Sequence, residues 1–599
     1  MCGIVGYIGK LQASDVILKG LHKLEYRGYD SCGISLFNEN IDDFILYKDK
    51  GRVNHLQDDF NYDFENHLGI GHTRWATHGA PNHINSHPHA SVSGRFVVVH
   101  NGVIDNYKEL TAKYLVGYSF ESETDTEVIA NLIESFASSY DVDIAIRKTL
   151  ALLEGSYALL VIDTRNPHII YAGKNKSPMI LGKRADGICL ASDLMALVGI
   201  SDEYYLIEDK TFVKAVKDES GYAFEMYDPV GIEFCPVRNE VHLDTEEINK
   251  GGFPHYMLKE ICEQPSVVRK IISNYAPDGK FIIDKEVLNL FANKKRIYIL
   301  AAGTSYHAGL LGKVYFEKIS GIPTEVFVAS EFAYNKPILE KESVFVLISQ
   351  SGETADLRAC LVDIKKLGYQ SLTITNVKTS TLAREATKYL EIFAGTEIAV
   401  ASTKAYVGQV SVLVIIACVL EQDNKCSLLT EMGRLAVAME AIIDRRDYIK
   451  ELIKTRLLKR NAFYIGRGID YFTCLEASLK LKEISYIQTE GFPAGELKHG
   501  TIALIEDGVP VIAIITQKHI NKNTRSNIQE VKARGAEVIV ISMNDIKESD
   551  DDIVLMDVHH ILSPILAVIP TQLITYYKAL DLGRDIDKPR NLAKSVTVE

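Results

Sequence analysis

The fold of the second half of the chain is decided by two similar stretches, RIYILAAGTSYHAG (296–309) and AFYIGRGIDYFTC (462–474). Each is a short apolar run that leads into glycine and polar residues, the pattern of a β-strand followed by a helix. Gly303 of the first stretch matches Gly468 of the second at a spacing of 165 positions. The recurrence favours two copies of one α/β domain over a chance likeness between two unrelated α/β units.

After residue 280, strand-like apolar runs alternate with glycine turns and amphipathic helices. This alternation is typical of a parallel sheet covered by helices. We therefore expect two doubly wound α/β domains, at 281–425 and 450–585, followed by a short tail at 586–599.

The first part of the chain differs in character. Residues 1–235 hold many short apolar runs separated by Gly, Asn and His turns, which indicates a layered α+β domain. One helix is well marked, because Thr124 and Glu127 in TDTEVIANLIESF match a capping box ahead of an apolar face. A polar, aperiodic stretch follows the domain, and we place a linker at 236–280.

Composition excludes several classes of protein. The 599 residues are 47% hydrophobic and 24% charged, as in globular proteins, which excludes disorder as the main state. Lys and Arg number 66 against 79 Asp and Glu, and the net charge of −13 argues against a nucleic-acid or anionic-membrane partner. The most apolar run, 410–420, is too short to span a membrane, and no secretory signal is recognised, so we expect a cytoplasmic protein.

The nine cysteines include no Cys-x-x-Cys pair, so neither a disulfide framework nor a thiolate zinc site is expected. Cys2 stands apart, because removal of Met1 would make it the N-terminal residue. Its thiol would then lie beside a free α-amino group, whose reference pKa of about 7.7 to 8.0 suits it to accept the thiol proton. The pattern indicates an N-terminal nucleophile, with an incidental cysteine as the alternative.

Other residues of this domain fit an amino acid substrate. Asn101 and Gly102 end a strand of the buried type, where an amide and a backbone N–H could face one oxyanion. Arg74 offers a planar fork for a carboxylate, and Asp125 offers an acceptor for an ammonium group. With the thiol, these groups suit an amino acid whose side-chain carbonyl is attacked.

Four histidines, His72, His78, His87 and His89, lie within 18 positions and raise the question of a zinc site. No cysteine or acidic residue lies at ligand spacing from them. We therefore expect loop structure and hydrogen bonding from these histidines, and no metal.

Hydroxyl residues gather where strands of the first repeat give way to helices. SQSGET (349–354) follows one strand, Thr304 and Ser305 follow another, and Ser402 and Thr403 precede a third helix. Hydroxyls and free N–H groups at helix N-termini bind phosphate, and open α/β sheets bind ligands at this edge. Helix capping alone explains one such hydroxyl better than it explains several.

The second repeat lacks these hydroxyls, since it reads ITQKHIN opposite SQSGET, so only the first copy is expected to hold phosphate. It carries Lys480 and Glu483 on one helix face, followed by His499. A carboxylate that moves a proton beside a carbonyl suits an aldose–ketose isomerisation. A solvated helix pair is an equal alternative at this point.

Two sets of motifs resemble known families. MCGIVGYIG, LEYRGYDSCGI, GHTRWATHG, HPH, VVVHNGVIDN and SETDTE resemble the glutaminase domain of class II glutamine amidotransferases. GTSY, SQSGET, GTEIAVASTKAY, LKLKEISYI, AGELKHG and DKPRNLAKSVTVE resemble the paired sugar isomerase domains of the isomerising glutamine:fructose-6-phosphate aminotransferase family. The resemblance implies an αββα N-terminal nucleophile domain followed by two sugar isomerase domains. It also implies that glutamine supplies ammonia to fructose 6-phosphate, giving glucosamine 6-phosphate and glutamate at the start of amino-sugar biosynthesis.

For the glutaminase half, the resemblance implies a γ-glutamyl thioester on Cys2, an oxyanion hole at Asn101 and Gly102, and support of the terminus by Arg27. It implies that glutamine is held by Arg74, Trp75, Thr77, His78, His87 and Asp125. Trp75, the only tryptophan of the chain, would also act in gating.

For the sugar half, the resemblance implies that Glu483 transfers a proton between C1 and C2 with help from Lys480, and that Lys594 forms a Schiff base with the ketose. His499 of the partner subunit would open the sugar ring. The sugar phosphate would be bound by Thr304, Ser305, Ser349, Gln350, Ser351, Thr354, Val400 and Ser402.

The expected partners are therefore glutamine, fructose 6-phosphate and a second copy of the chain, with no metal and no redox cofactor. An amidotransferase that uses phosphoribosyl pyrophosphate is disfavoured, because no motif of paired acidic residues after a strand is found. Cys2 and Lys594 argue against a non-catalytic sugar-phosphate sensor.

Overall fold

The computed structural model describes residues 2–25, 28–75, 79–240, 249–421 and 428–597. The chain divides into two compact units, residues 1–246 with 595–599 and residues 247–594. In these stretches we find no helix with the length and apolar character needed to cross a membrane.

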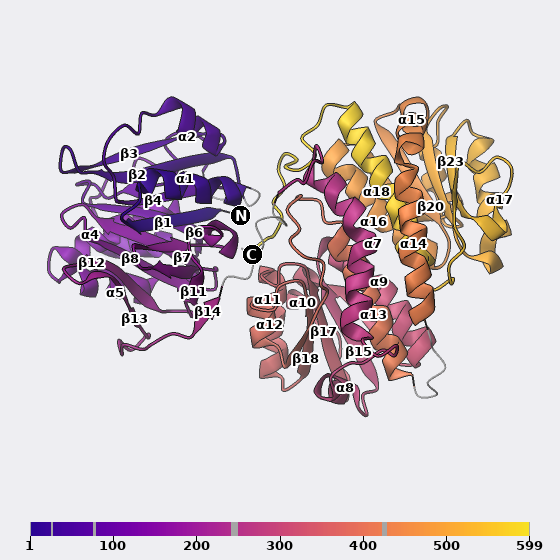
Figure 1. The fold of residues 1–599 in the computed structure, drawn as a ribbon, viewed down its shortest axis with the longest axis horizontal. Helices are drawn as coiled ribbons and strands as arrows, with labels where there is room; N and C mark the ends of the chain where they lie inside the picture. The colour runs from indigo at the N-terminus through magenta and orange to yellow at the C-terminus, as the bar shows by residue number, and fades with distance from the viewer. Residues whose placement is uncertain (1, 26–27, 76–78, 241–248, 422–427, 598–599) are drawn as a thin grey trace. The chain divides into compact units, whose positions relative to one another are not determined.

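Two antiparallel sheets form the first unit (Figure 1). In spatial order, the larger sheet consists of β14 (Arg238–Glu240), β11 (Glu203–Leu206), β9 (Ile180–Arg184), β10 (Gly187–Ala191), β1 (Gly3–Gly9), β4 (Leu68–Arg74), β2 (Ser31–Asn38) and β3 (Asp43–Lys50). The smaller consists of β13 (Gly221–Tyr227), β12 (Phe212–Asp218), β8 (Ile169–Asn175), β7 (Gly155–Asp163), β6 (Phe96–Ile104) and β5 (His89–Ala90). The accompanying helices are α1 (Ala13–Leu24), α2 (Val53–Asp59), α3 (Tyr107–Tyr114), α4 (Asp125–Ala137) and α5 (Val142–Leu152).

The alternation of side chains along β6 builds two cores. Val97 and Val99 pack between the two sheets, whereas Phe96 and Val98 pack against α4 and α5 on the other face. On the larger sheet, α1 covers β1 and β4. The layers therefore run helix, sheet, sheet, helix, and the predicted αββα fold is confirmed. Gly6 permits the close approach of the sheets, because a Cβ there would lie 2.5 Å from Cδ1 of Leu160.

Helix α4 begins where the sequence predicts, but the predicted capping box is wrong. Thr124 occupies the N-cap position without a side-chain capping hydrogen bond. Its hydroxyl pairs with Nε2 of His89 at 3.1 Å, and the Glu127 carboxylate accepts from the backbone N–H of Ser122 at 2.7 Å. Contacts to neighbouring loops therefore replace the local cap.

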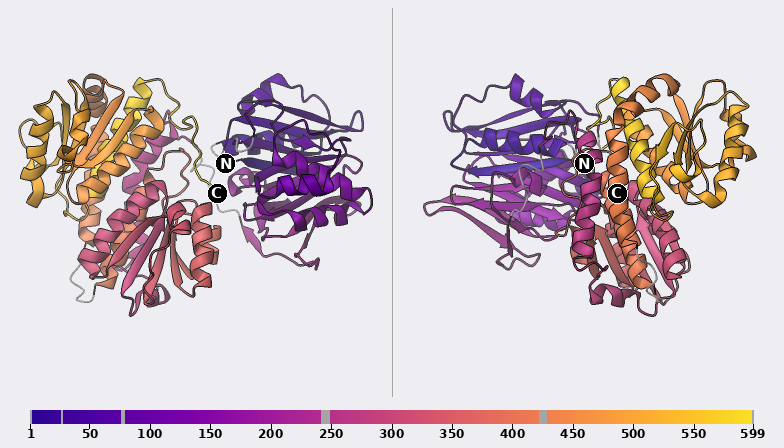
Figure 2. Two further views of the ribbon diagram at one scale, coloured as in Figure 1. Left: turned by 180° about the vertical axis from the view of Figure 1, so that it is seen from behind. Right: turned by 45° about the vertical axis from the view of Figure 1, so that its right-hand side comes forward.

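The second unit contains two parallel sheets, seen from two directions in Figure 2. In spatial order, the first consists of β16 (Thr324–Val328), β15 (Arg296–Ala301), β17 (Ser343–Ser349), β18 (Gln370–Thr375) and β19 (Lys388–Glu391). The second consists of β21 (Gln488–Pro493), β20 (Asn461–Gly466), β22 (Pro510–Ile515), β23 (Glu537–Met543) and β24 (Ile553–Leu555). Both sheets place their second strand at the edge, followed by the first, third, fourth and fifth, which confirms the predicted repeat.

Matching glycines start the helix that follows the first strand of each repeat. Gly303 has φ of 55° and Gly468 has φ of 58°, a left-handed conformation that favours glycine. The helices of this unit are α7 (Tyr256–Tyr275), α8 (Lys285–Phe291), α9 (Gly303–Tyr315), α10 (Ala329–Tyr334), α11 (Ala355–Lys366), α12 (Thr381–Glu385), α13 (Lys404–Leu420), α14 (Leu429–Asp444), α15 (Arg446–Arg456), α16 (Ile469–Ser485), α17 (Asn521–Lys532) and α18 (Ser563–Asp581).

The apolar run 410–420 lies in α13, most of whose residues are buried, so it belongs to the protein interior. Side chains of α13, α7 and α18 share one core with both parallel sheets. Within 236–280, where we expected a linker, the structure has strand β14 and the buried helix α7.

We predict that Leu132→Ala destabilises the first unit by about 2 to 5 kcal/mol, because Leu132 is fully buried on α4 and truncation leaves a cavity. Urea unfolding monitored by the fluorescence of Trp75, the only tryptophan, measures this unit alone. The matched Leu11→Ala variant removes a side chain that is 42% exposed and should shift the free energy of unfolding by less than about 0.5 kcal/mol. Equal effects of the two variants would contradict the assigned core.

Candidate active sites

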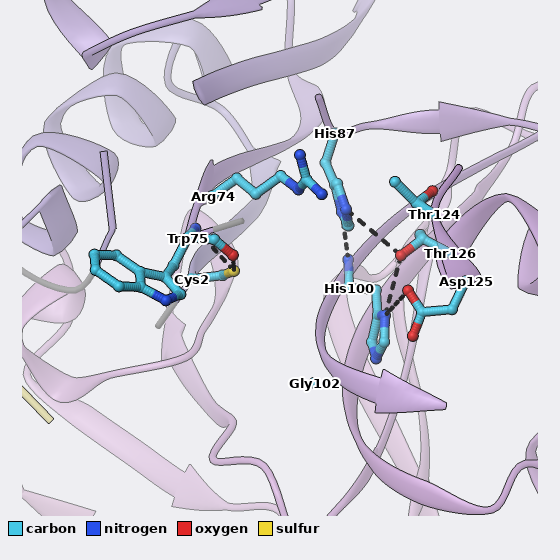
Figure 3. Close-up of a pocket in the computed structure, with 9 residues that line it drawn as sticks. All are labelled: Cys2, Arg74, Trp75, His87, His100, Gly102, Thr124, Asp125 and Thr126. Carbon is cyan, nitrogen blue, oxygen red and sulfur yellow. Dashed lines mark hydrogen bonds and ion pairs between the residues drawn. The ribbon is translucent and has the colours of Figure 1, made fainter. Parts of the chain in front are cut away.

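Cys2 lies directly before β1, beside the end of β4 (Figure 3). Its Sγ accepts the backbone N–H of Trp75 at 3.2 Å and lies 3.5 Å from the carbonyl oxygen of the same residue. Nδ2 of Asn101, on β6, donates to the carbonyl oxygen of Cys2 at 3.0 Å. Two strands from different sheets therefore fix the position of the thiol.

A pocket opens beside this thiol. Its lining residues are Cys2, Arg74, Trp75, His87, His100, Gly102, Thr124, Asp125 and Thr126. Six of them are predicted site residues, whereas His100, Thr124 and Thr126 were not predicted. Thr124 and Thr126 flank Asp125 in SETDTE, so their position in this motif could have indicated that they lie at the site.

The predicted oxyanion hole has a clear backbone constraint. Gly102 has φ of 135°, and a Cβ there would lie 1.9 Å from the carbonyl oxygen of Ser156. Only glycine fits this position, and Gly102 is one of the residues that line the pocket. The amide of Asn101 is already within hydrogen-bond distance of Cys2.

Opposite charges line the pocket. Arg74 and Asp125 are both buried, with exposed fractions of 3% and 5%. Oδ2 of Asp125 accepts the backbone N–H of Ile104 at 2.8 Å, so the carboxylate is held in place. Burial raises the pKa of the Cys2 thiol above its ordinary value, while the Trp75 N–H and the charge of Arg74 oppose that rise. The thiol therefore needs a nearby base to become a nucleophile.

The histidines form a buried hydrogen-bonded cluster. His72 stacks on His87 with ring centroids 4.1 Å apart. Nε2 of His72 lies 3.0 Å from both the carbonyl oxygen of His100 and Oδ1 of Asn101, which are two acceptors, so Nε2 carries the proton. Burial, followed by the charge of Arg74, lowers the pKa of His72 to about 3, so the ring is neutral at pH 7. Among the described residues, no group of three or more His, Cys, Asp or Glu could hold a metal ion.

Three residues expected at this site, Arg27, Thr77 and His78, lie outside the described residues.

In the first repeat, the predicted phosphate residues gather at the carboxyl ends of β15 and β17. These strands are parallel neighbours with Ala301 opposite Ile348, so helices α9 and α11 start at one edge. The hydroxyls of Ser349 and Thr354 lie 2.9 Å apart. The backbone N–H of Gly352 donates to Oγ of Ser349 at 3.0 Å.

The other predicted phosphate residues lie at the starts of the neighbouring helices. Ser305, near the start of α9, accepts from Nε2 of Gln409 at 3.0 Å. Gln350 and Ser351 lie in the turn between β17 and α11, and Val400 and Ser402 lie just before α13.

The second repeat places a carboxylate where the first has a hydroxyl. Asp470 matches Ser305 at the repeat spacing of 165 and is buried. It accepts the backbone N–H of Thr516 at 2.8 Å and also the Thr516 hydroxyl. A buried carboxylate at this position disfavours a phosphate, which supports the expectation that only the first repeat holds one.

Lys480 and Glu483 do not form a solvated pair, because the Lys480 side chain is only 1% exposed. Nζ of Lys480 donates to Oε2 of Glu483 at 2.6 Å and lies 3.6 Å from Oε1 of Glu476. Although burial opposes the charge, Glu483 and Glu476 raise the pKa of Lys480 above its ordinary value. The hydroxyl of Thr304 donates to Oε1 of Glu476 at 3.1 Å, which joins the two repeats.

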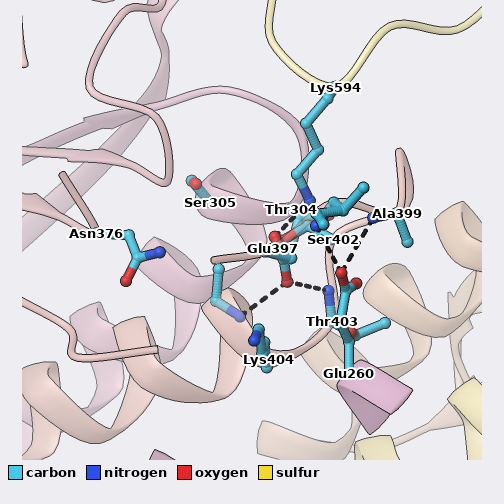
Figure 4. A network of polar contacts seen from close by, with 12 residues as sticks. Glu260, Thr304, Ser305, Asn376, Glu397, Ala399, Ser402, Thr403, Lys404 and Lys594 are labelled. Carbon is cyan, nitrogen blue, oxygen red and sulfur yellow. Dashed lines mark hydrogen bonds and ion pairs between the residues drawn. The ribbon is translucent and has the colours of Figure 1, made fainter. Parts of the chain in front are cut away.

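Glu476 was not predicted, although its spacing of four residues from Lys480 places both on one helix face. Glu397 was also missed, since nothing in GTEIAVASTKAY distinguishes its carboxylate from that of a surface residue. It is buried and pairs with Lys594, whose Nζ lies 2.5 Å from Oε2 of Glu397 (Figure 4). His499 is exposed in the turn η4 (Leu497–His499), and no side-chain hydrogen bond or ion pair joins it to these residues in the described chain.

Comparisons with known proteins agree on both halves. A family model described as a glutamine amidotransferase domain matches residues 43–220, and one described as a SIS domain matches residues 290–418 and 458–580. The curated glutamine–fructose-6-phosphate aminotransferase (isomerizing) of Bacillus licheniformis is 52% identical over 606 residues, which covers 100% of both chains. That of Bacillus subtilis is 50% identical, again over 100% of both chains.

A solved structure also matches the second unit. The C-terminal domain of glucosamine-fructose-6-phosphate aminotransferase from Francisella tularensis has a TM-score of 0.55 and 37% identity, and the match covers 57% of this chain and 100% of that one.

We predict that the neutral histidine cluster makes the first unit sensitive to acid. An unfolded His72 binds a proton below about pH 6.5, whereas the folded one does so only near pH 3, so the free energy of unfolding falls as the pH drops between these values. His72→Gln, which keeps a donor, should lower that slope by up to about 1.4 kcal/mol per pH unit in urea unfolding monitored through Trp75.

The control is His168→Gln, since His168 is exposed and should leave the slope unchanged. An unaltered slope in the His72 variant would show that its ring takes up a proton in the folded state.

Proposed function

The chain belongs to the glutamine–fructose-6-phosphate aminotransferase (isomerizing) family, and on that premise we propose how its own residues divide the reaction. The protein is a glutamine-dependent aminotransferase that converts fructose 6-phosphate to glucosamine 6-phosphate and glutamine to glutamate. The observation that carries the residue assignments is the pocket that joins Cys2, Arg74, Gly102 and Asp125.

Ammonia release begins at Cys2. Once Met1 is removed, the α-amino group accepts the thiol proton, and Sγ attacks the side-chain amide carbon of glutamine. The oxyanion that forms receives hydrogen bonds from Asn101 and the N–H of Gly102. Ammonia leaves with a proton returned by the amine, and water then hydrolyses the thioester to glutamate.

Glutamine is oriented by its α-groups. Arg74 binds the carboxylate and Asp125 binds the ammonium group, because each is buried and held beside the thiol. Trp75 and His87 complete the pocket wall, and we keep Thr77 and His78 as predicted contacts.

The sugar phosphate binds at the edge of the first parallel sheet. Hydroxyls and N–H groups at the starts of α9 and α11 hold its phosphate without a basic side chain. Lys594 forms a Schiff base with the ketose, Glu483 moves the proton between C1 and C2, and Lys480 orients that carboxylate at 2.6 Å.

We propose domain boundaries at 1–235, 281–425 and 450–585 with a catalytic tail at 586–599, since the family matches fall inside the first three. We also propose a homodimer. His499 is exposed and forms no side-chain hydrogen bond or ion pair with the site residues in the described chain, which supports ring opening by His499 of the partner subunit. A cytoplasmic location and the absence of nucleic-acid partners stay predictions.

We predict that Cys2→Ala abolishes glutamine-dependent synthesis of glucosamine 6-phosphate, measured as product formed from glutamine and fructose 6-phosphate. Slow synthesis from ammonium salts should persist, because the sugar site is untouched. A chain that retains an N-terminal extension should likewise lose glutaminase activity, since Cys2 then has no free α-amino group. Glutamine-dependent product from either variant would refute the assigned nucleophile or base.

We predict that Lys594→Ala prevents borohydride trapping of fructose 6-phosphate on the chain, measured by the mass of the intact protein. The matched Lys588→Ala variant, which changes a tail lysine outside the assigned sites, should trap normally. A persistent adduct in the Lys594 variant would move the Schiff base to another lysine.

A further inference from the structure

Two buried glutamates from different elements flank Lys594. Glu260 lies on α7 and is 2% exposed, while Glu397 lies between β19 and α13 and is 5% exposed. Figure 4 shows both carboxylates beside the segment that ends at Thr403.

The two oxygens of Glu397 have different partners. Oε1 accepts the backbone N–H groups of Thr403 at 2.8 Å and Ala405 at 3.0 Å, at the start of α13. Oε2 accepts from the hydroxyl of Ser402 at 2.9 Å and from Nζ of Lys594 at 2.5 Å. One oxygen thus anchors the carboxylate, and the other faces the amine.

This pair is closed to water. The Lys594 and Glu397 side chains are 3% and 0% exposed, so a proton leaving Nζ has Glu397 as its nearest acceptor. Although burial opposes ionisation, Lys594 and the two N–H groups hold the pKa of Glu397 below its usual range. The carboxylate is therefore ionised while the lysine is charged.

Glu260 supports the same segment. Its Oε1 accepts the backbone N–H groups of Ile398 at 2.5 Å and Ala399 at 3.1 Å, directly after Glu397. Its Oε2 has no hydrogen-bond partner in the described chain. Burial and the neighbouring charge of Glu397 raise the pKa of Glu260 well above its usual range. Glu260 is thus a positioning residue that adds little negative charge of its own.

The remaining charged groups near the pair are engaged elsewhere. Lys404 donates to Glu263 at 2.7 Å. Lys480, whose pKa Glu397 also raises, donates to Glu483 at 2.6 Å. Lys594 is therefore the cation that pairs directly with Glu397 in the described chain.

We propose that Glu397 is a catalytic residue, the proton acceptor and donor for Lys594 as this lysine forms its Schiff base. The proposal rests on the proposed role of Lys594. The Nζ ammonium gives one proton to Oε2, and the neutral amine adds to the C2 carbonyl of the open ketose, with an amine proton passing to the carbonyl oxygen. The resulting hydroxyl leaves as water with the proton returned by Glu397. The cationic iminium then again faces a carboxylate.

One positive charge lies beside Glu397 both before and after this step. The carboxylate therefore stabilises first the ammonium and then the iminium. The proton moves over the short distance between Nζ and Oε2, and no solvent is needed. Burial of Glu397 and Lys594 thus keeps the proton transfer between these two side chains.

The test measures the rate at which cyanoborohydride traps fructose 6-phosphate on the chain between pH 6 and 9. The unaltered chain should trap at a rate that changes little with pH. Glu397→Gln should trap about 100-fold more slowly at pH 7, and its rate should rise with pH because the ammonium must then lose its proton to solvent. Glu397→Asp keeps a carboxylate and should recover a pH-independent rate.

The matched control is Glu440→Gln, since Glu440 pairs with Arg269 at an exposed position and should leave trapping unchanged. Trapping by Glu397→Gln at the rate of the unaltered chain would overturn the proposal. So would a loss that is equal at every pH and is not recovered by Glu397→Asp, because that result indicates a structural role. If the unaltered chain forms no adduct, the proposed role of Lys594 fails instead.

Discussion

Burial of polar groups is the physical constraint on which both active sites depend. A buried donor, acceptor or charge that loses water must find a partner inside the protein. In the glutaminase pocket this requirement fixes His72 to two acceptors and holds Asp125 on a backbone N–H. In the sugar site it pairs Lys480 and Lys594 with carboxylates. The reactive groups therefore have defined positions before any substrate arrives.

Local patterns in the sequence predict most of the fold. The repeat at a spacing of 165 is matched by two parallel sheets of identical strand order, because the same strand and turn signals recur in both copies. Helix α4 (Asp125–Ala137) forms with its apolar face buried, yet its predicted capping box does not form. Short-range signals locate an element well, whereas the partner of a polar side chain depends on loops distant in sequence.

The partners of polar side chains in the sites also depend on residues distant in sequence. Six residues predicted from the first-domain motifs line one pocket. Glu397 and Glu260 were not found, since a buried glutamate and a surface glutamate look alike in sequence. Their burial arises only when α7, α13 and the tail come together. Thr77 and His78 lie outside the described residues, so for them the sequence remains the guide.

The core shared by α7, α13 and α18 makes the stability of each repeat depend on the other. Because these helices pack against both parallel sheets, each copy of the repeat completes the interior of the other. Neither copy could be released alone without exposing an apolar face to water. The two repeats are therefore expected to unfold together, as one cooperative unit.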